Sequence, residues 1–328
     1  MIDLCDRLVN RGRQKAKKKL CANIAQMLRK QGGKGIMKDG FLTKQATEGA
    51  EAMQQKTVWI TGASGGLGLA TAKAFARAGW QVIGGARSFP EGGDCTDGIH
   101  RIRLDVTDDA GCRAFAEKAL AISERVDALV CAAAVLVLGA CENTSPEEYS
   151  RVMDTNFVGT ARIVQLALPC MRRQQSGRIV LFSSINGLLG IPFQSAYTAS
   201  KHAMEGYAEC LAMETRRFGI RVCLVEPGDH RGGSDHTRLH ASGEGEASAY
   251  RAAYESGCAV IHRDETGGLS PDALGAKVVR NTQRRNMRFR LRVAKFDQHL
   301  AVWLHRLLPN WVNSFILRNY YGADKADH

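Results

Sequence analysis

Two residues in the middle of the chain have the types and the spacing that proton transfer requires. Tyr197 and Lys201 belong to the pentapeptide YTASK, and a spacing of four residues places two side chains on one face of a helix. A neighbouring cation favours the phenolate, so Lys201 should lower the pKa of Tyr197 from its usual value of about 10. Such a tyrosine can protonate a carbonyl oxygen as a hydride arrives, or take the hydroxyl proton in the reverse reaction.

Two serines at the end of an earlier predicted strand support this interpretation. Ser183 and Ser184 precede Tyr197 by fourteen and thirteen residues, at a point where a hydroxyl would hold the oxygen of a substrate. A tyrosine–lysine pair alone also occurs by chance on exposed helices. Together with the serines, the pair predicts a site for carbonyl reduction or alcohol oxidation.

A glycine-rich turn between a predicted strand and a predicted helix indicates a phosphate site. Residues 61–68 read TGASGGLG and follow the apolar strand 57–60. Gly62, Gly66 and Gly68 permit a tight turn and a close approach of the backbone to a pyrophosphate, and the helix N-terminus supplies free N–H groups. The order strand, turn, helix predicts a dinucleotide site, with a plain tight turn as the alternative.

The end of the second predicted strand, 81–85, selects the nucleotide. A site for NAD(H) has an acid there that binds the ribose hydroxyls. This strand leads instead to Arg87, whose guanidinium fits a 2′-phosphate, and Ser64 could add a hydroxyl donor. We therefore predict a preference for NADP(H). The alternative is a preference for NAD(H), in which case Arg87 would be a plain surface residue. Asp105 and Val106 close the third strand, either beside the adenine or as an ordinary turn.

The elements that must position these residues alternate along the chain. Strands followed by helices of ten or more residues predict right-handed βαβ units, and hence a Rossmann-type doubly wound parallel sheet in an α/β domain. The predicted strands are 57–60, 81–85, 102–104, 128–135, 178–182 and 222–225, and the predicted helices are 70–78, 112–125, 146–171 and 197–218. An alternation of charged and apolar residues over 288–293 is typical of an edge strand.

These motifs, in this order, resemble the classical short-chain dehydrogenase/reductase family over residues 56–230. The matching segments are TGASGGLG at 61–68, LDV at 104–106, NFVGT at 156–160, SS at 183–184, YTASK at 197–201 and EPG at 226–228. The resemblance implies an enzyme that transfers a hydride between a nicotinamide and a carbonyl or alcohol carbon. The segment 183–206 is similar to the steroid and retinol dehydrogenase branch, which implies an apolar steroid-, retinoid- or lipid-like substrate.

The resemblance also implies roles for single residues. Asn156, Ser184, Tyr197 and Lys201 would form the catalytic tetrad, with Ser184 preferred over Ser183 because thirteen residues is the family's usual gap. Lys201 would bind the nicotinamide ribose, and Asn156 would hold a water in a proton relay. The cofactor-binding residues that we expect are Gly62, Ser64, Gly66, Leu67, Gly68, Arg87, Asp105, Val106, Ala132, Ala133, Tyr197, Lys201, Pro227 and Gly228.

Two departures from the family's pattern bear on the site. Ala132-Ala133-Ala134 stands where the family usually has NAG, which predicts altered stability or cofactor affinity and not loss of binding. Asp229-His230 follows Gly228 where the family often has a threonine a few residues on, so the contact with the nicotinamide amide stays open. Asp229 and His230 form either an acid–base pair or a polar loop.

Three regions are expected. Residues 1–55 carry 12 Lys and Arg against 5 Asp and Glu, which is typical of a basic extension or linker; contact with nucleic acid through it is not expected. The catalytic domain spans 56–296 and includes a mobile lid at about 229–270. The helical tail, 297–328, would pack on the domain or line the substrate entrance, with a membrane-surface helix as the alternative.

The composition narrows the remaining possibilities. The ten cysteines contain no CxxC pair, so no metal is predicted, and neither a secretory signal nor a spanning apolar run is visible. We expect a cytoplasmic enzyme, with membrane association open, and the family resemblance implies a homodimer or homotetramer. The competing functions are a non-catalytic NADP(H)-sensing or scaffold protein, which the intact tetrad disfavours, and a sugar-nucleotide epimerase or dehydratase, which the TGxxxGxG turn disfavours.

Overall fold

The computed structural model describes residues 55–232 and 238–325. The strands are β1 (Thr57–Thr61), β2 (Gln81–Ala86), β3 (Asp94–Thr96), β4 (Ile99–Arg103), β5 (Ala128–Cys131), β6 (Leu136–Leu138), β7 (Gly177–Phe182), β8 (Ile220–Pro227), β9 (Arg238–His240) and β10 (Arg290–Val293). The α-helices are α2 (Gly66–Arg77), α3 (Asp109–Ile122), α4 (Pro146–Met153), α5 (Gly159–Gln174), α6 (Ser195–Thr215), α7 (Arg251–Thr266), α8 (Pro271–Thr282), α9 (Phe296–Leu307) and α10 (Asn310–Tyr321). The predicted extension at 1–55 lies outside the described residues, apart from its last position.

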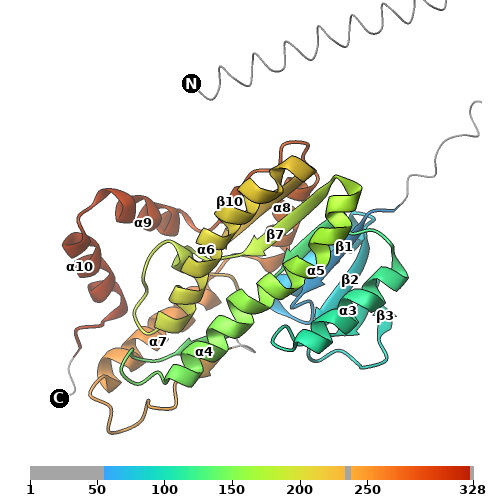
Figure 1. The fold of residues 1–328 in the computed structure, drawn as a ribbon. Helices are drawn as coiled ribbons and strands as arrows, with labels where there is room; N and C mark the ends of the chain where they lie inside the picture. The colour runs from blue at the N-terminus through green and yellow to red at the C-terminus, as the bar shows by residue number, and fades with distance from the viewer. Residues whose placement is uncertain (1–54, 233–237, 326–328) are drawn as a thin grey trace, which may run out of the picture. The chain divides into compact units, whose positions relative to one another are not determined.

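The main sheet confirms the predicted architecture. Its order is β10-β8-β7-β5-β1-β2-β4-β3, and its strands are parallel apart from β3, which runs antiparallel to β4 (Figure 1). The chain starts in the middle at β1, winds toward β4 and then returns past β1 to β5, β7, β8 and β10. This reversal is the point at which doubly wound sheets bind their ligands. The charged strand β10 lies at the edge, as its alternating pattern predicts.

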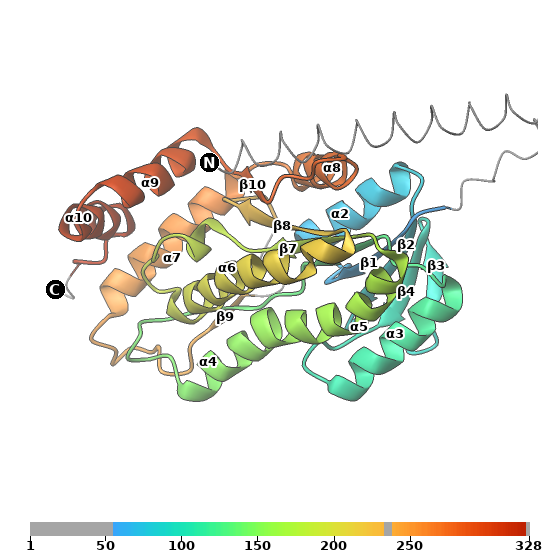
Figure 2. The same cartoon turned by 45° about the horizontal axis from the view of Figure 1, so that its top comes forward.

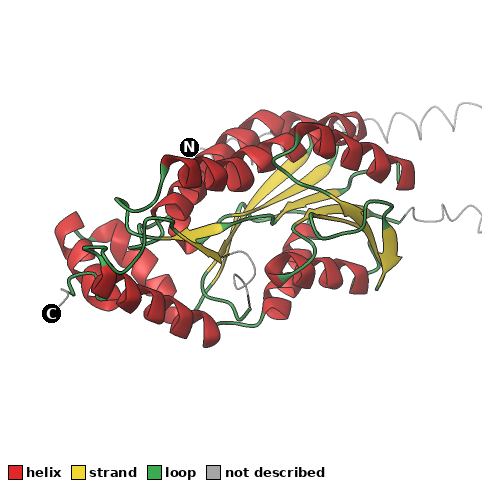
Figure 3. Cartoon of the chain, turned by 90° about the horizontal axis from the view of Figure 1, so that it is seen from below, coloured by secondary structure: helices red, strands yellow, loops and turns green. Residues whose placement is uncertain are grey.

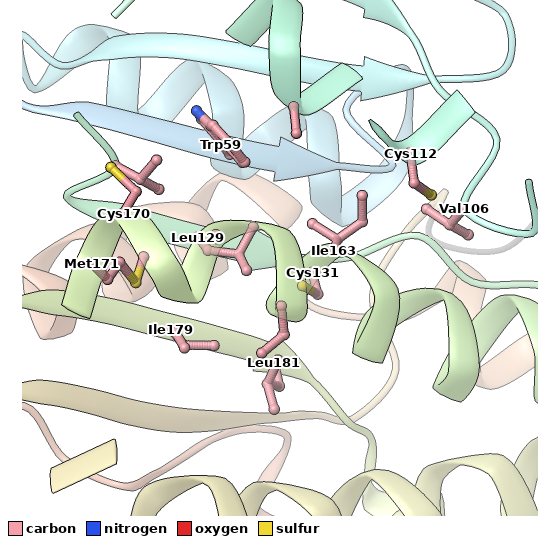
Figure 4. Packing of buried hydrophobic residues seen from close by; sticks show 14 of the residues in the cluster. Trp59, Val106, Cys112, Leu129, Cys131, Ile163, Cys170, Met171, Ile179 and Leu181 are labelled. Atoms are coloured by element: carbon pink, nitrogen blue, oxygen red, sulfur yellow. The ribbon is translucent and has the colours of Figure 1, made fainter. Parts of the chain in front are cut away.

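Alternating side chains bind helices to both faces of the sheet. In β1, Val58 and Ile60 join the core beneath α2 and α8, whereas Trp59 joins the core beneath α3, α5 and α6. Figures 2 and 3 show these two helical layers with the strands between them. In Figure 4, Trp59 and Leu129 of the sheet face Ile163 and Met171 of α5. Each such side chain contributes about 1.5–3 kcal/mol when it is fully buried.

The chain beyond β8 differs in part from the prediction. Within the segment expected to form a lid, about 229–270, the structure has a helix, α7, from Arg251 to Thr266. The tail forms two helices because Pro309, which has no N–H to donate, separates α9 from α10. β6 and β9 pair as a small parallel sheet of their own. The boundaries of the domain, lid and tail stay predictions, and 233–237 lie outside the described residues.

None of the described helices combines the length and the apolar character that crossing a lipid bilayer requires.

Candidate active site

A cavity of about 740 Å³ lies at the carboxyl ends of the parallel strands. The turns after β1, β2, β5, β7 and β8 line it, and α6, α7 and α10 close one end. Every residue of the expected catalytic and cofactor-binding sets contributes to its wall except Asn156. The fold therefore brings together, in one cavity, segments that are up to 259 positions apart in the sequence, from Gly62 to Tyr321.

Two positions of the turn between β1 and α2, Gly62 and Gly68, have no room for a side chain. Gly62 has a φ of +70°, and a Cβ there would lie 2.8 Å from the backbone nitrogen of Ala133. A Cβ on Gly68 would lie 2.1 Å from the carbonyl oxygen of Gly62. Gly65 precedes α2 and offers no capping side chain, so the first N–H groups of the helix have no side-chain acceptor there. The turn thus has the backbone cradle that a pyrophosphate requires.

Ala132 and Ala133 occupy the first two positions of the family's usual NAG motif, and Thr61 of the neighbouring strand β1 binds their backbone. The hydroxyl oxygen of Thr61 accepts hydrogen bonds from the backbone N–H of Ala132 at 3.2 Å and of Ala133 at 3.3 Å. The Cβ of Ala132 lies 3.5 Å from the position of a Cβ on Gly68. Thr61 therefore supplies a connection between β1 and the end of β5.

The end of the cavity near β2 carries exposed polar groups. Ser64, Arg87 and Ser88 all line it, and Ser88 was missed although it directly follows Arg87. Asp105 lies at the same end. Burial acts to raise the pKa of Asp105, but hydrogen bonds from Thr107 and the positive charge of Arg87 outweigh it and lower that pKa. This end therefore has a cationic side chain and hydroxyl donors next to one ionised acid.

Tyr197 and Lys201 lie at the other end of the cavity, on α6. The Nζ atom of Lys201 is 5.3 Å from the centre of the Tyr197 ring and donates a 2.7 Å hydrogen bond to the carbonyl oxygen of Phe182, at the end of β7. Only 2% of Lys201 is exposed. Burial lowers the pKa of Lys201 to about 8, while the charge of Glu205 acts in the opposite direction.

The prediction of a lowered tyrosine pKa is wrong for this structure. Burial raises the pKa of Tyr197 to about 12; the hydrogen-bonding interaction with Ser184 lowers it, and the charge of Glu265 raises it further. The sequence spacing identified the neighbouring cation but gave no measure of how far the phenol is removed from water. The phenol is consequently protonated at neutral pH, as a proton donor must be.

The two serines after β7 face different neighbours. Ser184 interacts with Tyr197 and accepts a 3.2 Å hydrogen bond from the backbone N–H of Asn186. The hydroxyl of Ser183 lies on the side of Gly187 and Glu205, since a Cβ on Gly187 would be 2.6 Å from Ser183 Oγ and 3.1 Å from Glu205 Cγ. The geometry therefore places Ser184 next to the phenol.

Asn156 lies in a π-helical turn, Asp154–Val158, between α4 and α5. Its Oδ1 accepts from the N–H of Val135 at 2.8 Å, and its Nδ2 donates to Val135 O and to Ser200 Oγ, each at 3.0 Å. Both amide hydrogens are therefore used within the protein, and the side chain has no N–H left for a water. In this structure the amide joins Val135, directly before β6, to Ser200 of α6. Turns of this π type are frequent at functional sites.

Asp229 and His230 do not form the acid–base pair that the sequence left open. Asp229 Oδ2 accepts from Gln298 Nε2 at 2.5 Å, whereas His230 Nδ1 pairs with the carbonyl oxygen of Gly228 at 2.9 Å. Burial raises the pKa of Asp229 to about 6, and the negative charges of Asp264 and Glu265 act in the same direction. Sequence reasoning missed Ile185, Ile191, Ile261, Asp264, Glu265 and Tyr321 on the cavity wall.

The raised pKa of Asp229 predicts a loss of stability with rising pH. Well below pH 3.8 the carboxyl is protonated in both states; from that value to about 6 the unfolded chain ionises first, which stabilises it relative to the native state. The rise from 3.8 to about 6 corresponds to about 3 kcal/mol. Asp229→Asn should therefore exceed the wild type in free energy of unfolding by up to about 3 kcal/mol at about pH 7, and equal it near about pH 4.

Urea titrations at several pH values measure this difference. Asp272→Asn is the control, because its side chain is 69% exposed and pairs only with the exposed Arg77 among the described residues. A difference between wild type and Asp229→Asn that does not change with pH would show that Asp229 has an ordinary pKa.

Comparisons with known proteins agree with this site. The family model for short chain dehydrogenases matches residues 56–240. A 3-ketodihydrosphingosine reductase from Bacteroides thetaiotaomicron is 35% identical over 273 residues, which cover 82% of this chain and 99% of that protein. Human 17-beta-hydroxysteroid dehydrogenase type 1 is 36% identical over 54% of this chain and 57% of its own length. A solved short-chain dehydrogenase from Streptomyces avermitilis is 30% identical, covers 80% of this chain and 96% of its own, and has a TM-score of 0.66.

Proposed function

Because the chain belongs to the short-chain dehydrogenase family and is therefore an oxidoreductase acting on CH–OH or C=O groups, we propose that it is an NADP(H)-dependent reductase of apolar ketones or aldehydes. The observation that carries the proposal is that one cavity has a protonated tyrosine next to Ser184 and Lys201 at one end and Arg87 at the other. When bound, the nicotinamide supplies the hydride. The residues described above fit such a cofactor, because the glycine turn and the start of α2 line the cavity and the helix N-terminus has no side-chain cap at Gly65.

Tyr197 is the proton donor in this proposal. Its phenol would give its proton to the carbonyl oxygen of the substrate, and Ser184 would orient that oxygen by a hydrogen bond. Lys201 would stabilise the phenolate that remains, since its ammonium is held beside the ring by Phe182. Asn156 would act as a positioning residue that fixes α6. The relay water suggested by the family resemblance would then have to donate to Asn156, whose Oδ1 accepts one hydrogen bond and has a second lone pair.

Arg87 determines the nucleotide preference in this proposal. It is exposed, it lines the cavity after β2, and no acid follows β2 at that point. A charge-assisted pair with a 2′-phosphate contributes about 1.5–3 kcal/mol, so Arg87→Ala should raise KM for NADPH about 10- to 100-fold and leave KM for NADH nearly unchanged. The assay follows loss of reduced-nicotinamide absorbance with each cofactor.

Arg103→Ala is the matched control for this experiment. Arg103 is an exposed arginine at the end of β4, where it pairs with Glu91, and it does not line the cavity. Equal changes in both variants would mean a general effect of charge. A preference for NADH in the wild type would overturn the assignment of Arg87 but would leave the reductase in place.

The substrate would be apolar, on the basis of the cavity wall beside Tyr197. Leu136, Ile185, Ile191, Ile261 and Tyr321 line that wall, and the carboxylates of Asp264 and Glu265 lie on it as well. The two relatives above are named for a sphingoid ketone and for hydroxysteroids. Retinal, steroid ketones, long-chain ketones and small aldehydes should be compared, and the large apolar compounds are expected to have the higher kcat/KM. Tight NADPH binding without turnover of any carbonyl would support the sensing alternative.

The assembly as a homodimer or homotetramer stays a prediction, as does the cytoplasmic location.

A further inference from the structure

Helices α9 and α10 present large apolar side chains to solvent. The residues of this surface, called the tail face below, are Phe296, Leu300, Trp303 and Leu307 on α9 and Trp311 and Phe315 on α10. Phe296 is 83% exposed and Trp311 is 74% exposed. On α9 the four residues recur at intervals of four, three and four positions, which places them on one side of the helix.

The fold does not need the tail face for its own packing. The opposite side of α9 carries Val302, which is fully buried in a cluster with Ile185, Leu189 and Ile191 next to the cavity. Asn313 connects the two helices, since its Nδ2 donates to His305 O at 3.3 Å and to Leu308 O at 3.0 Å. Contiguous exposed apolar surface of this kind marks an interaction site in a folded protein. Figures 1 and 2 show α9 and α10 beside α7, at the end of the domain opposite β3.

We propose that the tail face binds the surface of an anionic lipid bilayer. Two tryptophans and two phenylalanines have the chemistry of the boundary between headgroups and acyl chains. Arg306 and Arg318 lie on the same two helices, and both are exposed. Over 295–325 the chain has four Lys and Arg against two Asp and Glu, so the charge complements anionic headgroups.

A second copy of the chain fits this surface less well. A two-fold interface brings the same patch of both copies together, so the net positive charge of 295–325 would face itself. Those like charges would oppose association, whereas anionic lipid would favour it. The tail face therefore favours a bilayer over a dimer.

Binding at the tail face would hold one end of the cavity close to the lipid. Tyr321 of α10 and Ile261 of α7 both line that end, and Tyr321 also packs against the cluster around Val302. If the reductase function proposed above is correct, an apolar substrate would enter from the bilayer. The proposed bilayer contact is argued from the exposure of the tail face and from the net charge of the tail, so its test does not require enzymatic activity.

The tryptophans allow a direct test on the full chain. The sequence has four: Trp303 and Trp311 on the tail face, and Trp59 and Trp80, which are 0% and 6% exposed in the sheet domain. Vesicles of phosphatidylcholine and phosphatidylserine with brominated acyl chains should quench the emission of the two exposed tryptophans. The quenched component should disappear in Trp303→Phe with Trp311→Phe. Emission that stays accessible to aqueous acrylamide on vesicles would overturn the proposal.

A charge placed on the tail face should release the protein from vesicles. Leu307 is 60% exposed, and Leu307→Glu should lower partitioning onto phosphatidylserine-containing vesicles by at least about tenfold. Met213→Glu is the control, because Met213 is 72% exposed on α6, a helix that does not belong to the tail face. Both variants retain the basic residues 1–55.

Three results would count against the tail face. Equal vesicle binding by Leu307→Glu and wild type would assign the contact to another part of the chain, with the basic N-terminal region as the first candidate. Equal losses in Leu307→Glu and Met213→Glu would indicate a general charge effect. A dimer in the absence of lipid that Leu307→Glu dissociates would identify a second copy as the occupant.

Discussion

Replacing Tyr197 by phenylalanine should lower kcat for carbonyl reduction by about 10²- to 10⁴-fold. The substitution removes only the hydroxyl and keeps the ring against which the Lys201 ammonium lies at 5.3 Å. Because the proton leaves from that hydroxyl, the effect should fall on kcat and not on the affinity for NADPH. Stopped-flow single turnovers with NADPH, together with titration of cofactor fluorescence, separate the two quantities.

The neighbouring serines provide a matched pair of controls for this prediction. Ser184 interacts with the phenol, whereas Ser183 lies toward Gly187 and Glu205. Ser184→Ala should therefore lower kcat, and Ser183→Ala should change it far less. A Tyr197→Phe variant that retains activity within about tenfold of wild type would show that the proton comes from another group or from water.

The raised pKa of Tyr197 predicts how the rate of each direction depends on pH. A phenol with a pKa of about 12 keeps its proton at neutral pH, so it is ready to donate to a carbonyl. Alcohol oxidation needs the phenolate, which is scarce until the pH approaches that value. The difference between the two directions follows from burial, which the spacing of Tyr197 and Lys201 does not reveal.

The fold and the place of the motif residues at one cavity could be predicted because they depend on local patterns. Strand-and-helix alternation determines a doubly wound sheet, and such a sheet brings the turns after its strands to one edge. Arg87 and Gly62 therefore had to lie at the same cavity as Pro227, whatever the details of packing. Motif order fixes these positions without any knowledge of the side-chain contacts.

The residues that could not be predicted depend on long-range packing. Asn156 lies in a recognised motif, but its amide is used by Val135 and Ser200, which a local pattern does not specify. Tyr321 reaches the cavity only because α10 folds back beside α7. The spacing of apolar residues in a sequence shows that a helix has an apolar side, but it does not show what that side contacts.

The largest expected effect on stability lies at the edge strand β10. The sequence shows the alternating charges of this strand but not the residues with which they pair. Arg290 of β10 bonds to three carboxylates: Glu226 at 2.7 Å, Glu209 at 2.8 Å and Glu205. Glu226 is fully buried and Glu205 is 8% exposed. Burial raises the pKa of Glu205, and the bonds from Ser183 and Arg290 oppose that rise.

Arg290→Ala should lower the free energy of unfolding by about 3–5 kcal/mol, because it removes a cation that pairs with buried carboxylates. Arg292 would then be the remaining partner of Glu226. The loss, measured by urea titration, should shrink as the pH is lowered, since protonation removes the unpaired charge. Glu205→Gln in the Arg290→Ala background should recover part of the stability for the same reason.

Arg288→Ala, at an exposed position two residues earlier, is the control. If Arg288→Ala and Arg290→Ala cost the same, the buried carboxylates do not depend on Arg290, and β10 is held by its backbone hydrogen bonds and by Val293 alone.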